Sequence, residues 1–324
     1  MNTYRELDQT NDSDRFFEEN DRNRYRLYGG RNIFQFSYSP PYAQEVDYYG
    51  IPEGEDSQKS AKTRIREKNT RALKNAVHQS IDAPSSKSKK AAVNDYLRGK
   101  RGEELSEDDV LLDCTEYRIG YRDIARPTDE RTTIAAVLPK GVVTYTNLTT
   151  IRPYSIEPDD DSMSEVPLHS AYKKKYSDQE LFALLGLLNS LPFDFLIGEK
   201  TDKRIATYSL LESQVPRLES NDEWFDYIAE RAARLNCYGD EFEDMRERLG
   251  GIDPVTENEK RSLIQAEIDA ASLHIYGLDY KDTKFILEDF HRVQNPRVMT
   301  DEYFETVERK YLELSDQHSI QQLD

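Results

Sequence analysis

The amino-acid sequence predicts an α+β fold, in which a mixed or antiparallel sheet is followed by an α-helical C-terminal region. Two patterns support this prediction. Between residues 110 and 154, short apolar stretches alternate with turns, as they do in strands. From residue 219 onward, apolar residues recur about every three to four positions, which is the spacing of one helix face.

The first half of the chain contains the predicted strands. Residues 1–24 are polar and are predicted to be a disordered N-terminal segment. A strand is expected where Ile33, Phe34 and Phe36 follow the Gly29-Gly30 turn. Apolar residues predict further strands at 117–121, 134–138 and 142–145, and the acidic sequence EPDDDSMSE is expected to form a loop.

Helices dominate the second half. A helix is predicted from Ser177, whose hydroxyl can cap it and whose next residues include acids. A short apolar stretch at 193–197 and a strand or turn around Tyr208 follow. Beyond Pro216, helices are predicted around 224–232, at 257–276 with Gly277 as its C-terminal cap, at 281–290, and after Thr300.

The composition predicts large solvated faces, because 33% of the 324 residues are charged and only 37% are hydrophobic. We expect a sheet-containing domain at 25–218 and a helical region at 219–324. Cys114 and Cys237 lie far apart, without a metal-binding spacing to any histidine. The polar N-terminus does not resemble a signal peptide, and no apolar run has the length of a membrane span. These features predict a cytoplasmic protein with no membrane partner.

Charge is distributed unevenly along the chain. Residues 58–101 contain thirteen Lys and Arg and three acids, a local charge of +10, which leaves −28 for the rest of a chain whose net charge is −18. A basic segment retained in an acidic protein favours a polyanionic partner, since binding to nucleic acid releases condensed counterions. The alternative is a solvated helix followed by a flexible loop, with no partner.

A second basic feature is the sequence YRIGYRDIARPTDERTTIAAVLP at 117–139, which places four arginines before an apolar strand. Guanidinium groups on a rigid scaffold can hold phosphates or read base edges. They can equally pair with the acids Asp123, Asp129 and Glu130 and hold a loop in place. The residues alone leave both interpretations open.

One motif suggests catalysis but is better explained otherwise. Ser39-Pro40-Pro41-Tyr42 resembles the tetrapeptide with which DNA methyltransferases bind an exocyclic amine of a flipped base. That chemistry also needs a glycine-rich turn for S-adenosylmethionine, and the sequence contains no Gly-x-Gly. We therefore interpret the motif as a loop with two prolines, and we predict no catalytic, metal-binding or cofactor-binding residues in this chain.

Several segments together carry a family resemblance. In order, they are LYGGRNIFQF, YRIGYRDIARPTDERTTIAAVLPKGV, LFALLGLLNSLPFDFLIGEK, YSLLESQVP and AEIDAASLHIYGLDYKDTKFILEDF. Over residues 25–295 the chain resembles the C-terminal, target-recognition half of type II (type IIG-like) restriction-modification adenine-specific DNA methyltransferases and their phage-defence relatives. The segments of that family that bind S-adenosylmethionine and carry the catalytic Asn-Pro-Pro-Tyr are not matched.

The resemblance implies a DNA target-recognition domain at 25–218 whose catalytic part, together with its S-adenosylmethionine, is supplied by a separate methyltransferase subunit or another defence-system protein. Double-stranded DNA is the expected partner, and the chain alone is expected to lack enzymatic activity. The residues expected to contact DNA are basic: Arg31, Lys62, Arg64, Arg66, Arg71, Arg118, Arg122, Arg126, Arg131 and Lys140.

Two other hypotheses remain open from the sequence. The chain could be a site-specific adenine DNA methyltransferase in its own right. It could also be a non-catalytic adaptor whose helical region 219–324 binds another protein of a defence system.

Overall fold

The computed structural model describes residues 2–20, 24–56, 58–82, 87–125, 129–290 and 296–321, and it confirms the predicted α+β class. The strands are β1 (Thr3–Tyr4), β2 (Tyr25–Tyr28), β3 (Tyr48–Gly50), β4 (Arg118–Arg122), β5 (Ala135–Leu138), β6 (Val143–Thr144), β7 (Leu148–Ile151), β8 (Tyr154–Ile156) and β9 (Tyr172–Lys174). The helices are α1 (Ala61–Ser80), α2 (Lys89–Arg101), α3 (Asp178–Leu188), α4 (Leu191–Gly198), α5 (Thr207–Glu212), α6 (Phe225–Asn236), α7 (Glu243–Arg248), α8 (Asn258–Ile275), α9 (Tyr280–Phe290) and α10 (Asp301–Gln321).

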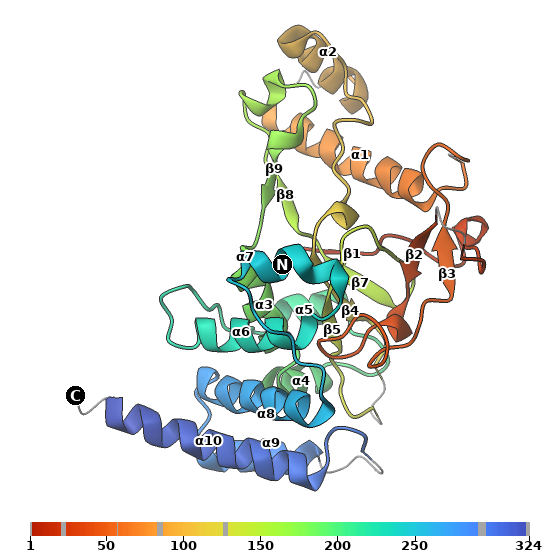
Figure 1. Ribbon diagram of the computed structural model, residues 1–324. Helices are drawn as coiled ribbons and strands as arrows, with labels where there is room; N and C mark the ends of the chain where they lie inside the picture. The colour runs from red at the N-terminus through yellow and green to blue at the C-terminus, as the bar shows by residue number, and fades with distance from the viewer. Residues whose placement is uncertain are drawn as a thin grey trace.

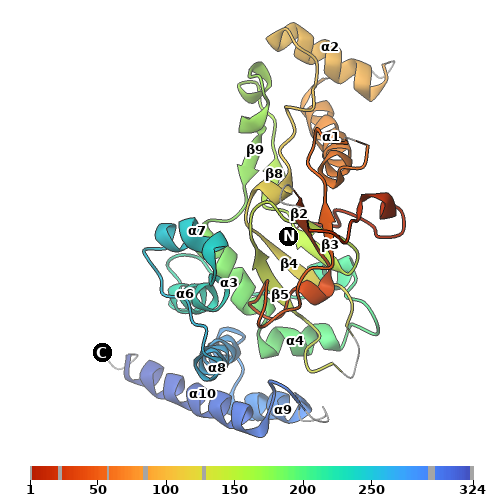
Figure 2. The same cartoon turned by 45° about the vertical axis from the view of Figure 1, so that its right-hand side comes forward.

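The molecule is elongated and arranged in three tiers (Figure 1). The upper tier contains α1, α2 and the β8–β9 ribbon. A sheet lies in the middle with α3 and α6 beside it, and α8, α9 and α10 form the lower tier. Figure 2 shows the same order of tiers after a 45° turn.

The central sheet is antiparallel, with the strand order β1-β7-β4-β5. In its middle, Ile119 of β4 lies opposite Val137 of β5. A second sheet has the order β3-β2-β6, with β2 antiparallel to β3 and parallel to β6. Because β6 belongs to the second sheet and β7 to the first, the turn at 145–147 joins the two sheets.

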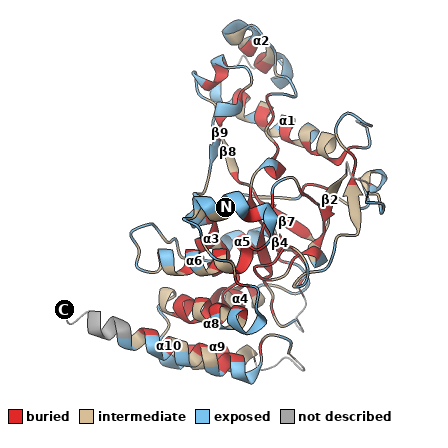
Figure 3. Cartoon of the chain, viewed as in Figure 1, coloured by how far each residue is buried: buried red, intermediate tan, exposed pale blue. Residues whose placement is uncertain are grey.

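Two hydrophobic cores support this arrangement (Figure 3). The smaller core packs α1 and α2 against the N-terminal segment and the region around β8 and β9. The larger core packs the central sheet against α3, α6, α8 and α10 and contains residues on both sides of residue 218. Gly186 allows α3 and α6 to approach each other closely in this core, because a Cβ at this position would lie 2.4 Å from the Cγ2 atom of Ile228.

Local sequence signals correctly predicted several helix ends. The Ser177 hydroxyl accepts the N–H of Glu180, and the Glu180 carboxylate accepts the N–H of Ser177, which forms a capping box at the start of α3. The Thr300 hydroxyl accepts the N–H of Tyr303 at the start of α10. Gly277 has a φ of +68°, the left-handed conformation typical of a helix C-terminus.

Three local predictions were wrong. Residues 2–20 are ordered, because β1 pairs with β7 and the neighbouring Leu7 is buried in the smaller core. The sequence at 33–37 forms a tight turn instead of a strand, with a φ of +55° at Phe36. Its apolar side chains are buried because the turn packs into the larger core, and burial alone does not distinguish a strand from a buried turn. Tyr208 lies on helix α5.

Among the described residues, no single helix is long and apolar enough to cross a membrane. The pair α3 and α4, which is bent by 58°, passes that test only when the two helices are taken together. Both helices are largely buried in the larger core.

Candidate nucleic-acid interface

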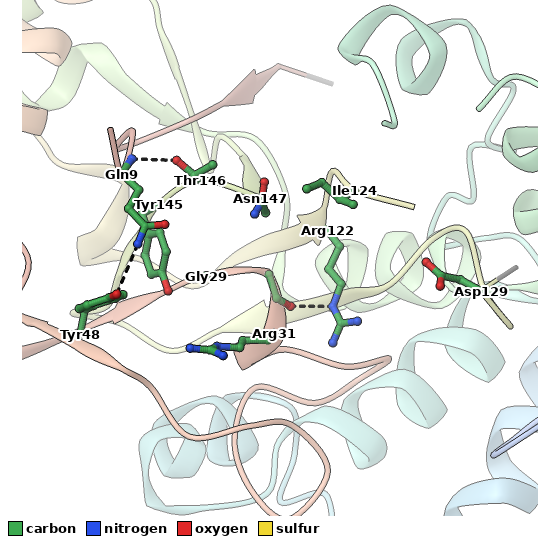
Figure 4. Close-up of a pocket in the computed structure, with 11 residues that line it drawn as sticks. Gln9, Gly29, Arg31, Tyr48, Arg122, Ile124, Asp129, Tyr145, Thr146 and Asn147 are labelled. Carbon is green, nitrogen blue, oxygen red and sulfur yellow. Dashed lines mark hydrogen bonds between the residues drawn. The ribbon is translucent and has the colours of Figure 1, made fainter. Parts of the chain in front are cut away.

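A cleft of about 430 Å³ opens between the loop after β2, the end of β4 and the turn that joins the two sheets (Figure 4). Two glycines bring the loop close to the turn. A Cβ at Gly29 would lie 2.6 Å from the ring of Tyr145, and a Cβ at Gly30 would lie 2.8 Å from the carbonyl oxygen of Asn147. The buried Asn32 side chain then accepts the N–H of Gly29 at 2.7 Å and closes the loop.

Arg31 lies at the rim of this cleft on an exposed position of the loop. Its side chain is 57% exposed, and its Nε donates to the Asp47 carboxylate at 2.7 Å. An exposed ion pair of this kind contributes little to stability and exchanges readily for another anion. Arg31 is therefore available to a phosphate group.

Arg122 at the end of β4 forms the inner wall. Its Nε donates to the Gly30 carbonyl at 2.6 Å, and its Nη2 donates to the Ile33 carbonyl. Burial lowers the pKa of Arg122 below its usual value; the Asp129 carboxylate opposes this shift and the nearby Arg297 adds to it. Arg122 thus presents a charged group that is held in position by neutral acceptors.

The opposite wall of the cleft consists of uncharged side chains that can form hydrogen bonds. Asn147 has a φ of +73° in the turn between β6 and β7, and its Oδ1 accepts from Arg204 at 3.4 Å. The Thr146 hydroxyl accepts the N–H of Gln9 at 2.8 Å, and the side chain of Gln9 reaches the Tyr48 hydroxyl. Amide and hydroxyl groups beside two arginines suit recognition of a polyanion with hydrogen-bonding edges.

Two arginines of the 117–139 segment are in the interior, which corrects their assignment as DNA contacts. Arg118 is fully buried and donates to both carboxylate oxygens of Glu6 at 3.0 Å. Arg131 is 5% exposed and pairs with Asp269 of α8 at 2.9 Å. A buried guanidinium needs a counter-charge, and here each one has found a carboxylate from a distant part of the chain.

Two further basic residues of this region were expected to contact DNA. Arg126 lies outside the described residues, so its contact stays a prediction. Lys140 follows β5 and pairs with Asp244 of α7 at 3.0 Å, and it does not line the cleft. Its DNA contact stays a prediction.

The basic segment 58–101 is less positive in the structure than in the sequence, because acids from other segments lie against it. Arg64 pairs with Asp12, Arg66 with Glu53, and Arg101 with Asp109. The Lys62 ammonium lies 4.5 Å from the centre of the Tyr25 ring. In the part of the chain that the structure describes, Arg71 on the exposed face of α1 has no ion pair, so it can still contact an outlying phosphate.

Arg66 and Arg71 are expected to respond differently to substitution. Arg66→Ala should lower the free energy of unfolding by about 1–3 kcal/mol, because Arg66 binds Glu53 through two nitrogens and also the carbonyls of Glu107 and Val110. Arg71→Ala should change it by less than about 0.5 kcal/mol. Urea unfolding of both variants checks this difference, and equal losses would contradict it.

Sequence reasoning missed the uncharged half of the cleft. Gln9 was assigned to a disordered segment, and Asn147 carried only the weak signal that asparagine tolerates the left-handed conformation. Gly29-Gly30 was interpreted as a turn, which is correct, but its close contact with Tyr145 and Asn147 depends on residues more than a hundred positions away.

The Gly29-Gly30 turn offers no open site for the ribose of S-adenosylmethionine, because Tyr145 and Asn147 fill the space beside its two glycines. Ser39-Pro40-Pro41-Tyr42 is a turn, as predicted, and its tyrosine hydroxyl donates to the Thr256 carbonyl. No cluster of three His, Cys, Asp or Glu side chains in the described ranges could hold a metal ion. We therefore derive no methyl-transfer step from this chain.

Comparison with known proteins found a structural likeness but no match in sequence. No protein-family model and no curated protein matches the sequence. Among solved structures, the type IIL restriction-modification enzyme MmeI in complex with DNA aligns with 90% of this chain at 12% sequence identity and a TM-score of 0.43. The aligned region is 35% of that enzyme, so this chain spans about a third of its length.

Proposed function

We propose that this chain is the DNA-recognition component of a restriction-modification or phage-defence system, and that it positions a separate adenine-N6 methyltransferase part on duplex DNA. The observation that carries the proposal is the meeting of Arg31 and Arg122, from distant parts of the sequence, in one cleft with amide and hydroxyl side chains. The family-like segments of the sequence suggest the type of system. S-adenosylmethionine would belong to the separate part.

Each wall of the cleft has a role in this proposal. Arg31 and Arg122 would hold a phosphate or the O6 and N7 acceptors of a guanine. Asn147 would bind the N6 and N7 atoms of an adenine, for which an amide is the best matched side chain. Arg71 of α1 would add sequence-independent affinity through an outlying phosphate.

The test is binding to a pool of labelled duplexes with randomised sequence. We expect the wild-type protein to bind and, after rounds of selection, to enrich one consensus sequence. Arg31→Glu should weaken binding about ten- to thirtyfold, since it replaces a phosphate contact of roughly 1–2 kcal/mol by a repulsion. Fluorescence anisotropy measures both affinities.

Arg217→Glu is the matched control, because the Arg217 side chain is 85% exposed and lies outside the cleft. It should bind as the wild type does. Equal affinity of Arg31→Glu and Arg217→Glu for duplex DNA would show that the cleft is not part of the DNA interface. A pool that yields no consensus would rule out sequence-specific recognition.

A further inference from the structure

A second pocket, of about 470 Å³, lies between the turn at 34–42 and the first turns of α8. Phe34 and Tyr42 form its aromatic walls. Gln265 of α8 lines it from below, and Arg261 and Arg297 supply its positive charge. The pocket is therefore aromatic and cationic, a combination that suits a nucleotide.

Arg261 is the unusual group in this pocket. It is 5% exposed, and in the described structure its guanidinium donates to neutral acceptors: the carbonyls of Leu235 at 2.6 Å, Val255 at 2.8 Å and Phe36 at 3.5 Å, and the Ser37 hydroxyl at 2.9 Å. Across the described ranges, no carboxylate pairs with it. Burial lowers the pKa of Arg261 below its usual value. Buried Arg118 and Arg131 each have a carboxylate, so Arg261 differs from both.

Further positive charge gathers around the same aromatic wall. The guanidinium carbons of Arg297 and Arg122 each lie 5.9 Å from the centre of the Phe34 ring. Arg122 belongs to the cleft described above, and Arg297 belongs to this pocket. Phe34 thus joins the two sites, and an anion bound beside it would relieve the repulsion between these cations.

Two carboxylates lie near this pocket. Glu130 does not line the pocket, and its carboxylate accepts the backbone N–H groups of Arg297, Val298 at 3.0 Å and Met299 at 3.4 Å. Glu259 lines the pocket at an exposed position, where solvent screens its charge. Among the residues that line the pocket, Arg261 and Arg297 therefore outnumber the single carboxylate, which leaves an excess of positive charge.

We propose that this pocket binds a phosphate group, with Arg297 as the contact at its mouth, Arg261 as the buried charge beneath and Gln265 as an uncharged donor. The phosphate can come from the backbone of bound DNA or from a free nucleotide. Binding of a DNA phosphate rests on the proposed function, and it would extend the DNA interface from the cleft across Phe34 to this pocket. Binding of a free nucleotide does not depend on the proposed function.

The experiment compares Arg297→Ala with the wild type in two arms. In the first, affinity for the randomised duplex pool is measured against salt concentration. Losing one phosphate contact should lower the slope of log affinity against log salt by about one unit, and Arg297→Lys should restore it.

In the second arm, adenosine 5′-monophosphate is titrated calorimetrically into each protein. Gln265→Glu, which places a carboxylate in the pocket without removing a bond to Arg261, should act like Arg297→Ala, and Arg217→Ala should have no effect.

The outcomes separate the two proposals. A reduced slope assigns the pocket to a DNA phosphate, and loss of nucleotide binding with an unchanged slope assigns it to a free nucleotide. If the wild type binds no duplex, the proposed function fails and the nucleotide arm alone decides. If neither arm responds to Arg297→Ala or Gln265→Glu, the phosphate site is overturned, whatever the wild type binds.

Discussion

Replacing Arg131 with methionine is expected to lower the free energy of unfolding by about 3–5 kcal/mol, because the change leaves a buried carboxylate without its cation. Asp269 accepts from Arg131 at 2.9 Å, from the N–H of Leu191 at 2.9 Å and from the Tyr303 hydroxyl at 2.5 Å. Although burial opposes the charge, Asp269 raises the pKa of Arg131 above its usual value. The ion pair links the residues before β5 to α8 inside the larger core. Through Leu191 and Tyr303, Asp269 also links α8 to α4 and α10.

Urea unfolding followed by tryptophan fluorescence measures this loss in the relevant core. Trp224 is the single tryptophan of the sequence, and its ring stacks on His274 of α8 with ring centres 5.7 Å apart. Arg71→Met, on the exposed face of α1, is the matched control and should change stability by less than about 0.5 kcal/mol. A loss below about 1 kcal/mol for Arg131→Met would mean that Asp269 is satisfied by its other donors.

Replacing Arg122 with glutamate is expected to weaken binding of duplex DNA about 100-fold, which corresponds to roughly 2.7 kcal/mol. The substitution removes a positioned guanidinium from the inner wall of the cleft and places a carboxylate beside Asp129, where it would repel a phosphate. Arg122 differs from Arg118 and Arg131 because its hydrogen bonds go to carbonyls, and no carboxylate among the described residues forms an ion pair with it.

The binding measurement needs a control for the fold, since Arg122 also holds the carbonyls of Gly30 and Ile33. Arg122→Gln removes the charge and keeps one amide donor on a shorter side chain, without adding a repelling carboxylate, so it should weaken binding by an intermediate factor. The urea midpoint of each variant shows whether it is folded under the binding conditions. Wild-type affinity in a folded Arg122→Glu variant would exclude this side chain from the DNA interface.

Local signals explain which elements were predictable. The capping residues Ser177 and Thr300 and the glycine at 277 mark helix ends through bonds within a few residues, so the helices could be placed from the sequence. The turn at 33–37 could not be, because its apolar residues are buried by helices far along the chain. The N-terminal segment was mistaken for a disordered one because the partners of its buried residue Glu6, which are Arg118 and Thr144, lie more than a hundred residues away in sequence.

Charge was the least predictable property. The +10 of residues 58–101 is a sum over neighbours in sequence, whereas the electric field depends on neighbours in space. Acids from outside the segment form ion pairs with its cations and offset six of its ten excess positive charges: Asp12, Glu53, Asp56, Glu104, Asp109 and Asp160. The cleft around Arg31 and Arg122 has fewer cations, and Arg122 there donates to carbonyl oxygens.

The sequence by itself determined the α+β class, the strands β4, β5 and β6, the helices α3, α6, α8, α9 and α10, and the concentration of arginines at 117–139, because these follow from local periodicity and composition. Only the tertiary structure decided what each arginine does. The partners of Arg118 and Arg131 lie 112 and 138 residues away in sequence, and pairing over such separations leaves no local pattern. The same folding that buries these two arginines places Arg122 beside the Gly29-Gly30 loop, where its charge faces a cleft.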